Sequence, residues 1–509
     1  MTAPADLVLT NAEVHTLAPP EDGGDRVEEA VAVRDGRIVR VDSAYEVGFL
    51  EGAGTEVVDC EGATVLPGFV DAHTHMEMVG RTLVHADLSG AADAGEALDR
   101  LADRAAATEG WVLGYGYDES AWPETEYLTR EGLDRVSENR PVAAFREDMH
   151  VASVNSVVLD RYGGEMPEAD VRTAGGRPTG VLVEGAVDVL FEHTAPDYAD
   201  TRELVVAARD HAHERGVTGV HEMVRNSHAP RVYRALDRAG ELGLRVRLNY
   251  WTDHLDALEE LGATTGHGSE MVRVGAVKSY TDGSFGGRTA KLSSPYADAD
   301  TTGQWVVEPD RLREYVARAD GAGLQFAAHA IGDEAVEATL EAYAEASDRR
   351  HRVEHAELLT DDTIERFADL GVVASVQPNF LKWAREGGLY EARLGERAAR
   401  TNRYADLLAA GVVVAFGSDC MPLDPLFGVD QAVTAPADSQ RLTVTQALRA
   451  YTYGGAYAAG EEDERGTVEP GKRADLTVLA DSPWEADAVA DVDVALTVVD
   501  GQVVHDGRD

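Results

Sequence analysis

Hydrophobic and polar positions alternate with a period of two near both ends of the chain. This alternation is typical of strands that bury one face, and Asp-Gly turns between such stretches favour hairpins. The stretches are Asp6–Val14, Ala30–Val41, Thr55–Val65, Ala474–Leu479, Val492–Val499 and Gln502–His505, with turns at Asp35-Gly36 and Asp500-Gly501. We therefore expect residues 1–66 and 468–509 to form one small composite β-sandwich from both termini.

Between these ends, short apolar runs alternate with stretches of helical periodicity, which predicts parallel βα units. The expected strands are Phe69–His75, Val217–His221, Arg245–Trp251, Arg273–Tyr280, Leu324–His329, His351–His355, Val372–Val376 and Val412–Ser418. The expected helices include Glu203–Arg215, Pro309–Ala322, Asp333–Ala346 and Asp361–Leu370. Eight strands are the number that a closed TIM barrel needs. The pattern predicts an α/β fold with a distorted (β/α)8 barrel over residues 67–467.

The gap between the first two barrel strands, about residues 81–205, is too long for one connecting helix. It predicts an inserted subdomain that contains the segments Trp111–Tyr117, Pro141–His150 and Asn155–Leu159. Its aromatic residues either shape substrate specificity or form the core of the insertion. They are Trp111, Tyr115, Tyr117 and Trp122.

The net charge of the chain is strongly negative. Among 509 residues, 92 are acidic and 46 are basic, for a formal net charge of −46, whereas the hydrophobic content of 44% is ordinary. Self-repulsion of this size destabilises a compact state unless salt screens it. The composition resembles that of halophilic proteins, and it argues against nucleic-acid binding, which needs a basic surface.

Cysteine content and hydropathy indicate the cellular compartment of the protein. Cys60 and Cys420 are the two cysteines, too few for a disulfide framework or a cysteine-based zinc site. The sequence after Met1 lacks the pattern of a signal peptide, and no window reaches 18 uninterrupted apolar residues. We expect a cytoplasmic protein without a membrane partner.

The most informative motif is Pro-Gly-Phe-Val-Asp-Ala-His-Thr-His at residues 67–75. On a strand, positions i and i+2 point to the same face, about 7 Å apart. His73 and His75 can therefore bind one metal ion together at the end of a strand. A His-x-His pair alone is weak evidence, so the motif needs partners elsewhere in the chain.

Partners appear at the C-terminal ends of later predicted strands. Lys278 lies on the fourth strand, His329 and His355 end the fifth and sixth, and Asp419 follows the eighth. The active site of a (β/α)8 barrel lies at this rim, so these side chains should converge with His73 and His75. Imidazole nitrogens and carboxylate oxygens suit zinc and neighbouring transition metals. The set is sufficient for one Zn²⁺ ion or two.

These motifs, in this order, resemble the amidohydrolase superfamily over nearly the whole chain. The matching segments are residues 67–75, His-Ala-Ile-Gly-Asp at 329–333, Arg-Val-Glu-His-Ala at 352–356, Gly-Ser-Asp at 417–419 and Gly-Thr-Val-Glu-Pro-Gly-Lys-Arg-Ala-Asp-Leu at 466–476. Val-Lys at 277–278, Thr-Asp-Gly-Ser at 281–284 and Gly-Arg-Thr at 287–289 look like the branch of YtcJ-like proteins and N-substituted formamide deformylases.

The resemblance implies roles for individual residues. The superfamily's metal-ligand positions fall on His73, His75, His329, His355 and Asp419. Lys278 falls where some members carry a carboxylated lysine that bridges two metal ions. Such a carbamate is an anionic oxygen donor, whereas an ordinary ammonium group would be repelled by the cations. A structural salt bridge is the alternative role of Lys278.

The expected reaction follows from the metal. Zinc lowers the pKa of bound water to about 7 and polarises a carbonyl oxygen. Asp419 would accept a proton from this water and pass it to the leaving nitrogen, which predicts hydrolysis of an amide or other non-peptide C–N bond. A deaminase of the same fold is one alternative. A non-catalytic binding or regulatory scaffold is another, but its mark would be the loss of ligands.

Six further residues are candidates for contact with a small-molecule substrate, each with a structural alternative. They are His150, Asn155, Glu184, His221, Asp282 and Arg288. Arg288, for example, could bind a substrate carboxylate or pair with an acidic neighbour.

A second His-x-His pair, His211 and His213, lies in a predicted helix. Side chains at i and i+2 of a helix diverge, so this pair is expected at the surface. A homodimer is expected only from the general frequency of such assemblies.

Overall fold

The computed structural model describes residues 3–19, 24–119, 122–147 and 149–508. The chain divides into two compact units. We call the first, Met1–His75 with Arg209–Asp509, the barrel unit, and the second, Met76–Ala208, the insertion unit. The inserted subdomain predicted at about residues 81–205 lies within the second of these ranges.

The barrel unit contains an eight-stranded parallel sheet in the order β21-β20-β19-β18-β17-β16-β15-β8. The strands are β8 (Phe69–Thr74), β15 (Val217–Val224), β16 (Arg245–Trp251), β17 (Val272–Tyr280), β18 (Gln325–Ala330), β19 (Arg352–His355), β20 (Val373–Val376) and β21 (Val414–Phe416). Each corresponds to one predicted strand. The predicted TIM-barrel fold is confirmed.

The barrel closes where the segment after β21 meets β8. The backbone N–H of Asp419 donates to the carbonyl of His73 at 2.8 Å. The N–H of Ser418 donates to Oδ1 of the buried Asp71 at 3.0 Å. Gly417 permits this approach, because a Cβ atom there would lie 2.4 Å from the backbone nitrogen of His73. The seam therefore fixes Asp419 beside the His-x-His strand.

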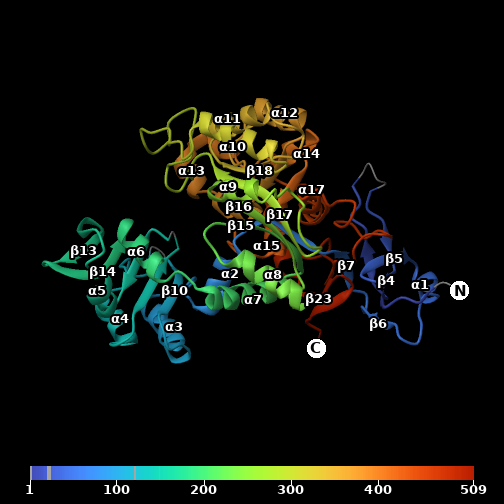
Figure 1. The fold of residues 1–509 in the computed structure, drawn as a ribbon, viewed down its shortest axis with the longest axis horizontal. Helices are drawn as coiled ribbons and strands as arrows, with labels where there is room; N and C mark the ends of the chain where they lie inside the picture. Colours follow the sequence, from blue (N-terminus) through green and yellow to red (C-terminus); the bar gives the residue numbers. More distant parts are fainter. Residues whose placement is uncertain (1–2, 20–23, 120–121, 148, 509) are drawn as a thin grey trace. The chain divides into compact units, whose positions relative to one another are not determined.

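Helices cover the outside of the barrel, as α10, α11, α12 and α14 do in Figure 1. The helices that follow β15 in the barrel unit are α8 (Ala229–Ala239), α9 (Leu255–Glu260), α10 (Pro309–Gly321), α11 (Asp333–Tyr343), α12 (Asp361–Leu370), α13 (Leu389–Leu394), α14 (Tyr404–Ala409), α15 (Pro425–Val433), α16 (Val444–Arg449) and α17 (Gly455–Ala458). Shorter turns are η4 (Thr252–His254), η5 (Pro378–Trp383), η6 (Gly395–Arg400), the π-helical η7 (Ala450–Gly454) and η8 (Val489–Asp491). Local signals set the bounds of α12, since Thr360 forms a capping box and Gly371 ends the helix with a φ of 63°.

Two terminal sheets complete the barrel unit. One has the order β5-β4-β1-β6 and the other β24-β23-β22-β7-β2-β3. Their elements are β1 (Leu7–Thr10), β2 (Glu13–His15), β3 (Val27–Glu28), β4 (Ala30–Arg34), β5 (Arg37–Asp42), α1 (Ala44–Gly48), β6 (Glu56–Asp59), β7 (Thr64–Pro67), β22 (Leu476–Leu479), β23 (Val494–Val499) and β24 (Gln502–Asp506). Val65 of β7 pairs with Val478 of β22, so both ends of the chain share one sheet. One apolar cluster contains side chains from both sheets, such as Leu9, Val31 and Val65.

The insertion unit contains a six-stranded sheet in the order β13-β14-β12-β11-β10-β9. Its elements are α2 (Met76–Val84), β9 (Ala86–Asp87), α3 (Ala94–Ala107), β10 (Val112–Tyr117), α4 (Arg130–Val136), β11 (Val142–Arg146), β12 (Val151–Val154), α5 (Ser156–Tyr162), η3 (Glu168–Asp170), β13 (Val171–Ala174), β14 (Arg177–Val183) and α6 (Gly185–His193). The helix α7 (Tyr198–Glu214) runs from this unit into the barrel unit.

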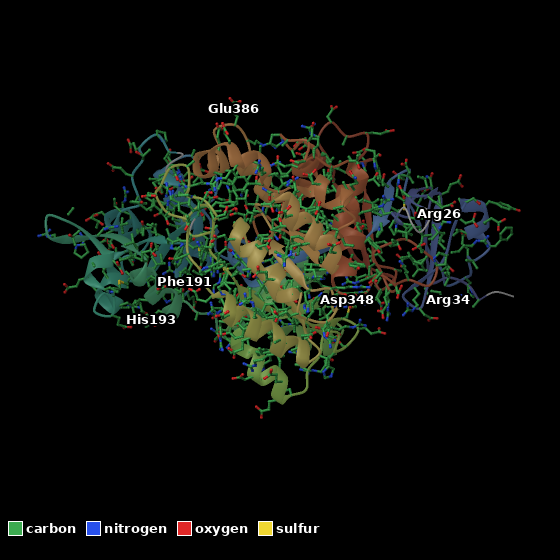
Figure 2. The ribbon with its side chains drawn as sticks, turned by 90° about the horizontal axis from the view of Figure 1, so that it is seen from above. Arg26, Arg34, Phe191, His193, Asp348 and Glu386 are labelled. Atoms are coloured by element: carbon green, nitrogen blue, oxygen red, sulfur yellow. The ribbon has the colours of Figure 1, made fainter. Side chains whose placement is uncertain are left out.

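Aromatic side chains form much of the core of the insertion unit. Tyr117 and Trp122 are buried in one apolar cluster, and Tyr115 is buried in another. Phe191 of α6, labelled in Figure 2, stacks on Phe145 with ring centroids 5.2 Å apart. Trp111 packs against the second cluster. These contacts support the core alternative for the aromatic residues of this segment.

Among the described residues, no helix combines the length and the apolar character that crossing a bilayer requires.

Candidate metal centre

Three donor atoms converge at the C-terminal rim of the barrel. Oδ1 of Asp419 lies 3.6 Å from Nε2 of His73 and 3.3 Å from Nε2 of His75. Within the described ranges, these three residues form a group whose potential ligand atoms lie within 4.8 Å of one another. His73 is buried, whereas the side chain of His75 is 31% exposed. The group is therefore open on the side of His75.

The other predicted ligands lie next to this group. The ring centroid of His355 is 4.9 Å from that of His73 and 4.5 Å from that of His329. Lys278 is buried, with Nζ 5.4 Å from the ring centroid of Trp251. His329 and His355 do not belong to the three-residue group, so the structure brings them close without completing a single tight cluster.

Hydrogen bonds fix the tautomers of two imidazoles. Nδ1 of His73 lies 2.6 Å from Oε2 of Glu354, whose pKa is lowered to about 2 because Arg352 and His73 outweigh the effect of burial. The carboxylate therefore accepts, Nδ1 donates and Nε2 stays free. Nε2 of His329 donates to the carbonyl of Gly283 at 2.9 Å, which leaves Nδ1 free.

Burial keeps three of these imidazoles neutral. It lowers the pKa of His73, lowers that of His329 to about 3 and lowers that of His355 well below its ordinary value. A neutral imidazole has a free lone pair, which is what a metal ligand requires. In contrast, the pKa of His75 is raised: burial lowers it, but the hydrogen bond to Asp419 and the negative charges of Asp419 and Glu222 together outweigh burial.

Asp419 is held as a carboxylate in an unusual backbone conformation. Burial alone would raise its pKa, but the neighbouring His73 and His75 lower it. Asp419 has a φ of 50° and His355 a φ of 72°, in the left-handed region that side chains rarely adopt. Strained residues of this kind cluster at functional sites.

The donor set fits a divalent cation. Free imidazole nitrogens together with a carboxylate oxygen are the ligands that zinc and similar metals prefer. The hydrogen bond from His73 to Glu354 is also the kind of support that metal-binding histidines receive. His73, His75 and Asp419 would hold the ion, with His329, His355 and Lys278 beside it.

Two substrate candidates of the barrel unit have structural contacts. Oδ2 of Asp282 accepts from the N–H groups of Gly332 and Lys291 at 2.9 and 2.7 Å, and Oδ1 accepts from Ile331 at 3.0 Å. Arg288 donates to both carboxylate oxygens of Asp298, at 3.0 and 2.7 Å. These contacts favour the structural alternative for both residues.

His221 lies inside the barrel rather than at its surface. It is fully buried, and its Nδ1 accepts from Arg352 at 2.7 Å. Burial and the guanidinium group of Arg352 lower its pKa well below the ordinary value. His221 is therefore a neutral side chain that carries its proton on Nε2, a buried atom without a hydrogen-bond partner among the described residues.

The remaining candidates belong to the insertion unit. Asn155 is buried and caps α5, and its Nδ2 donates to the carbonyls of Ser137 and Arg140 at 2.8 Å. These contacts favour a role in holding the insertion together. His150 and Glu184 are exposed side chains whose Nδ1 and Oε2 lie 3.2 Å apart, and their contact with a substrate stays a prediction.

The predicted surface position of the second His-x-His pair is wrong for His213. His211 and His213 were expected at the surface of a helix. They do lie on α7, but His213 is buried, and its Nε2 donates to the carbonyl of Gly243 at 2.7 Å. The i and i+2 positions diverge on the helix as expected, and one of them points inward.

Sequence reasoning did not single out three residues behind the metal centre: Arg352, Glu354 and Ser375. All are buried, and all contact one another. Arg352 and Glu354 lie inside the Arg-Val-Glu-His-Ala motif. Charged side chains at i and i+2 of a strand that also carries a ligand could have indicated them, because both point into the barrel.

A parallel barrel with imidazoles and a carboxylate at its C-terminal rim has the architecture of a metal-dependent enzyme. Residues 56–505 match the model of an amidohydrolase family. The chain belongs to this family and is a metal-dependent hydrolase, which confirms the resemblance that its motifs indicated.

Relatives match over nearly the full chain. The Bacillus subtilis protein YtcJ, named as an amidohydrolase, is 32% identical over 95% of this chain and 97% of its own. The N-substituted formamide deformylase of Arthrobacter pascens is 28% identical over 98% of both chains. A crystal structure of a metal-dependent hydrolase from Pyrococcus furiosus aligns with a TM-score of 0.81 and 31% identity, covering 94% of this chain and all of the other.

Proposed function

We propose that this enzyme hydrolyses an amide or other non-peptide C–N bond of a small molecule. The observation that carries the proposal is the convergence of His73 Nε2, His75 Nε2 and Asp419 Oδ1 at the rim of the barrel. The similarity to a formamide deformylase over 98% of the chain supports C–N cleavage. A divalent cation bound there, which we propose to be Zn²⁺, would lower the pKa of water and polarise a carbonyl group.

Asp419 is proposed as the proton carrier. Because its pKa is lowered, its carboxylate is ionised at neutral pH and can accept a proton from the attacking water. It would then donate this proton to the leaving nitrogen, so that the amine departs without a negative charge. The backbone hydrogen bond from Asp419 to His73 keeps the carboxylate beside the histidine pair throughout.

Aromatic side chains line the histidine cluster. The ring of Tyr280 lies 4.9 Å from that of His329, and the ring of Phe380 stacks parallel to that of His355 at 6.1 Å. Apolar faces at these positions exclude water from one side of the centre. This exclusion strengthens the electrostatic interaction between Asp419 and a reacting group.

Lys278 is proposed to carry a carboxyl group on Nζ. Its burial lowers the pKa to about 8, which increases the fraction of neutral amine that can react with carbon dioxide. The new N–C bond replaces an N–H bond, and the proton passes to solvent. Intact-mass measurement in bicarbonate should show the added carboxyl group, and a Lys278→Ala variant should lack it. An unmodified mass for the active protein would contradict this part.

Asp419→Asn tests the proposed proton transfer. The amide cannot accept the proton, so turnover should fall by about 10²–10⁴-fold. Two imidazoles remain, so most of the metal should stay bound. The measurements are metal content by elemental analysis and hydrolysis of formamides, acylated amino acids and cyclic amides. Full activity of the variant would contradict the role of Asp419.

Asp438→Asn is the matched control, since Asp438 has a side chain that is 99% exposed and lies in the same unit. Its activity should equal that of the unaltered enzyme.

The reaction products distinguish amide hydrolysis from the deaminase alternative, because a deaminase releases ammonia from an amidine carbon. An amine together with a carboxylate indicates amide hydrolysis.

A further inference from the structure

Glu354 has further buried contacts beyond its hydrogen bond to His73. Its side chain is fully buried. Oε2 accepts from Nδ1 of His73 at 2.6 Å and from Oγ of Ser375 at 2.7 Å. Oε1 lies 2.8 Å from Nε of Arg352. A buried carboxylate with three such partners has its position determined from three directions.

Arg352 connects this carboxylate to other barrel strands. One terminal nitrogen donates to the carbonyl of Ala72 at 2.6 Å and to Oγ of Ser375 at 2.8 Å. The other donates to Nδ1 of His221 at 2.7 Å. Because Ala72 precedes His73 on β8, Arg352 fixes the backbone of the ligand strand while Glu354 fixes the imidazole.

We propose that Glu354 is a positioning residue, held by Arg352, that presents Nε2 of His73 to the metal. The inference rests on the proposed function, because it assumes that His73 is a ligand. The hydrogen bond requires the proton on Nδ1 and sets the plane of the ring. A carboxylate partner also makes the imidazole a stronger electron-pair donor to the metal. Removal of such a partner lowers metal affinity by about 10–100-fold.

Glu354→Gln tests this role. The uncharged side chain weakens the hydrogen bond to His73 and leaves Arg352 without its counter-charge. We expect Zn²⁺ affinity, measured by competition with a chromophoric chelator, to fall by about 10–100-fold. The absorption bands of the Co²⁺-loaded protein should shift, because the ligand field at the metal changes. A structural role alone would move neither quantity beyond its effect on unfolding.

Glu461→Gln is the matched control. Glu461 is also a buried glutamate of the barrel unit and pairs with buried arginines, Arg247 and Arg465, but not with a predicted ligand. Its loss should lower the unfolding midpoint while Zn²⁺ affinity and the Co²⁺ spectrum stay unchanged. Equal losses of affinity in both variants would overturn the proposal.

Glu354→Asp covers the case in which the glutamine variant does not fold. Aspartate keeps the charge beside Arg352 but withdraws the acceptor from His73 by one methylene group, so the variant should fold and still bind Zn²⁺ weakly. Unchanged affinity in a folded Glu354 variant overturns the positioning role. Unaltered protein that binds no Zn²⁺ would instead contradict the proposed function.

Discussion

At the scale of single residues, His15 shows how two acidic neighbours favour the charged form of a buried histidine. Its Nδ1 lies 2.6 Å from Asp25 and its Nε2 2.8 Å from Glu13, and its ring stacks on Trp484 at 3.9 Å. Burial lowers the pKa of His15, but the hydrogen bonds to the two carboxylates outweigh it, and the net shift is upward from 6.5. The charged form is therefore stabilised by folding.

This shift predicts a pH dependence of stability. A folded pKa above the unfolded value of 6.5 stabilises the protein fully below pH 6.5, and this contribution is lost as the pH rises through the folded pKa. Urea unfolding of the unaltered protein and of His15→Gln should differ most at acidic pH and converge at alkaline pH. A difference that grows with pH would contradict the assignment. His267→Gln, at an exposed histidine, is the control variant.

The residue scale also shows what the sequence alone could predict about the site. His73, His75 and Asp419 were predicted because they recur in motifs at strand ends. The contact of His73 with Glu354 was not, because the two residues are 281 positions apart. Their pairing depends on the register of β19 relative to β8, which no local pattern encodes.

At the scale of elements, closure of the barrel depends on the absence of a side chain at Gly417. A Cβ atom at Gly417 would lie 2.4 Å from the backbone nitrogen of His73 and 2.9 Å from its Cα. Real Cβ atoms essentially never approach so closely, and backbone atoms cannot move aside as a flexible side chain can. The seam between β8 and the segment after β21 therefore tolerates only hydrogen at this position.

Gly417→Ala should consequently open the seam. We expect the free energy of unfolding to fall by about 1–3 kcal/mol or more, as in overpacked cores, and metal affinity to fall with it because His73 and Asp419 move apart. Gly321→Ala is the control, since open space surrounds Gly321 near the end of α10. Chemical denaturation and chelator competition measure both effects. A Gly417→Ala protein of full stability would contradict the packing argument.

Elements with strong local signals were predicted well. Predicted helix Asp361–Leu370 has the bounds of α12, where a capping box and a C-terminal glycine mark both ends. The last barrel strand was predicted as Val412–Ser418 but is confined to Val414–Phe416. Its apolar run, residues 412–416, begins two residues before the paired segment, and hydrophobicity alone does not show where pairing starts or stops.

At the scale of the whole molecule, the large negative net charge is the main electrostatic feature. The chain has a net charge of −46, so like charges repel across the folded surface. The range of this repulsion shortens from about 10 Å in 0.1 M salt to about 3 Å in 1 M salt. Arginine ion pairs, such as Arg318 with Asp256 and Glu259, offset part of it locally.

Stability should therefore rise with salt. The thermal midpoint should increase by several degrees between low and molar KCl, measured by circular dichroism, and activity should increase with it. Sucrose at equal osmolality is the comparison, because it stabilises proteins by exclusion from their surface without screening charge, so the increase in KCl should exceed the increase in sucrose. A midpoint that is highest in dilute buffer would contradict the prediction of a protein adapted to high salt.

The pairing of β7 with β22 has a consequence for the order of events at the ribosome. Val65 is synthesised long before its partner Val478, so β7 leaves the exit tunnel with one edge unpaired. That edge stays open while the barrel strands are made, and non-local pairing of this kind is slow. During synthesis, the nascent chain therefore exposes this strand to chaperones and to neighbouring chains until β22 has been made.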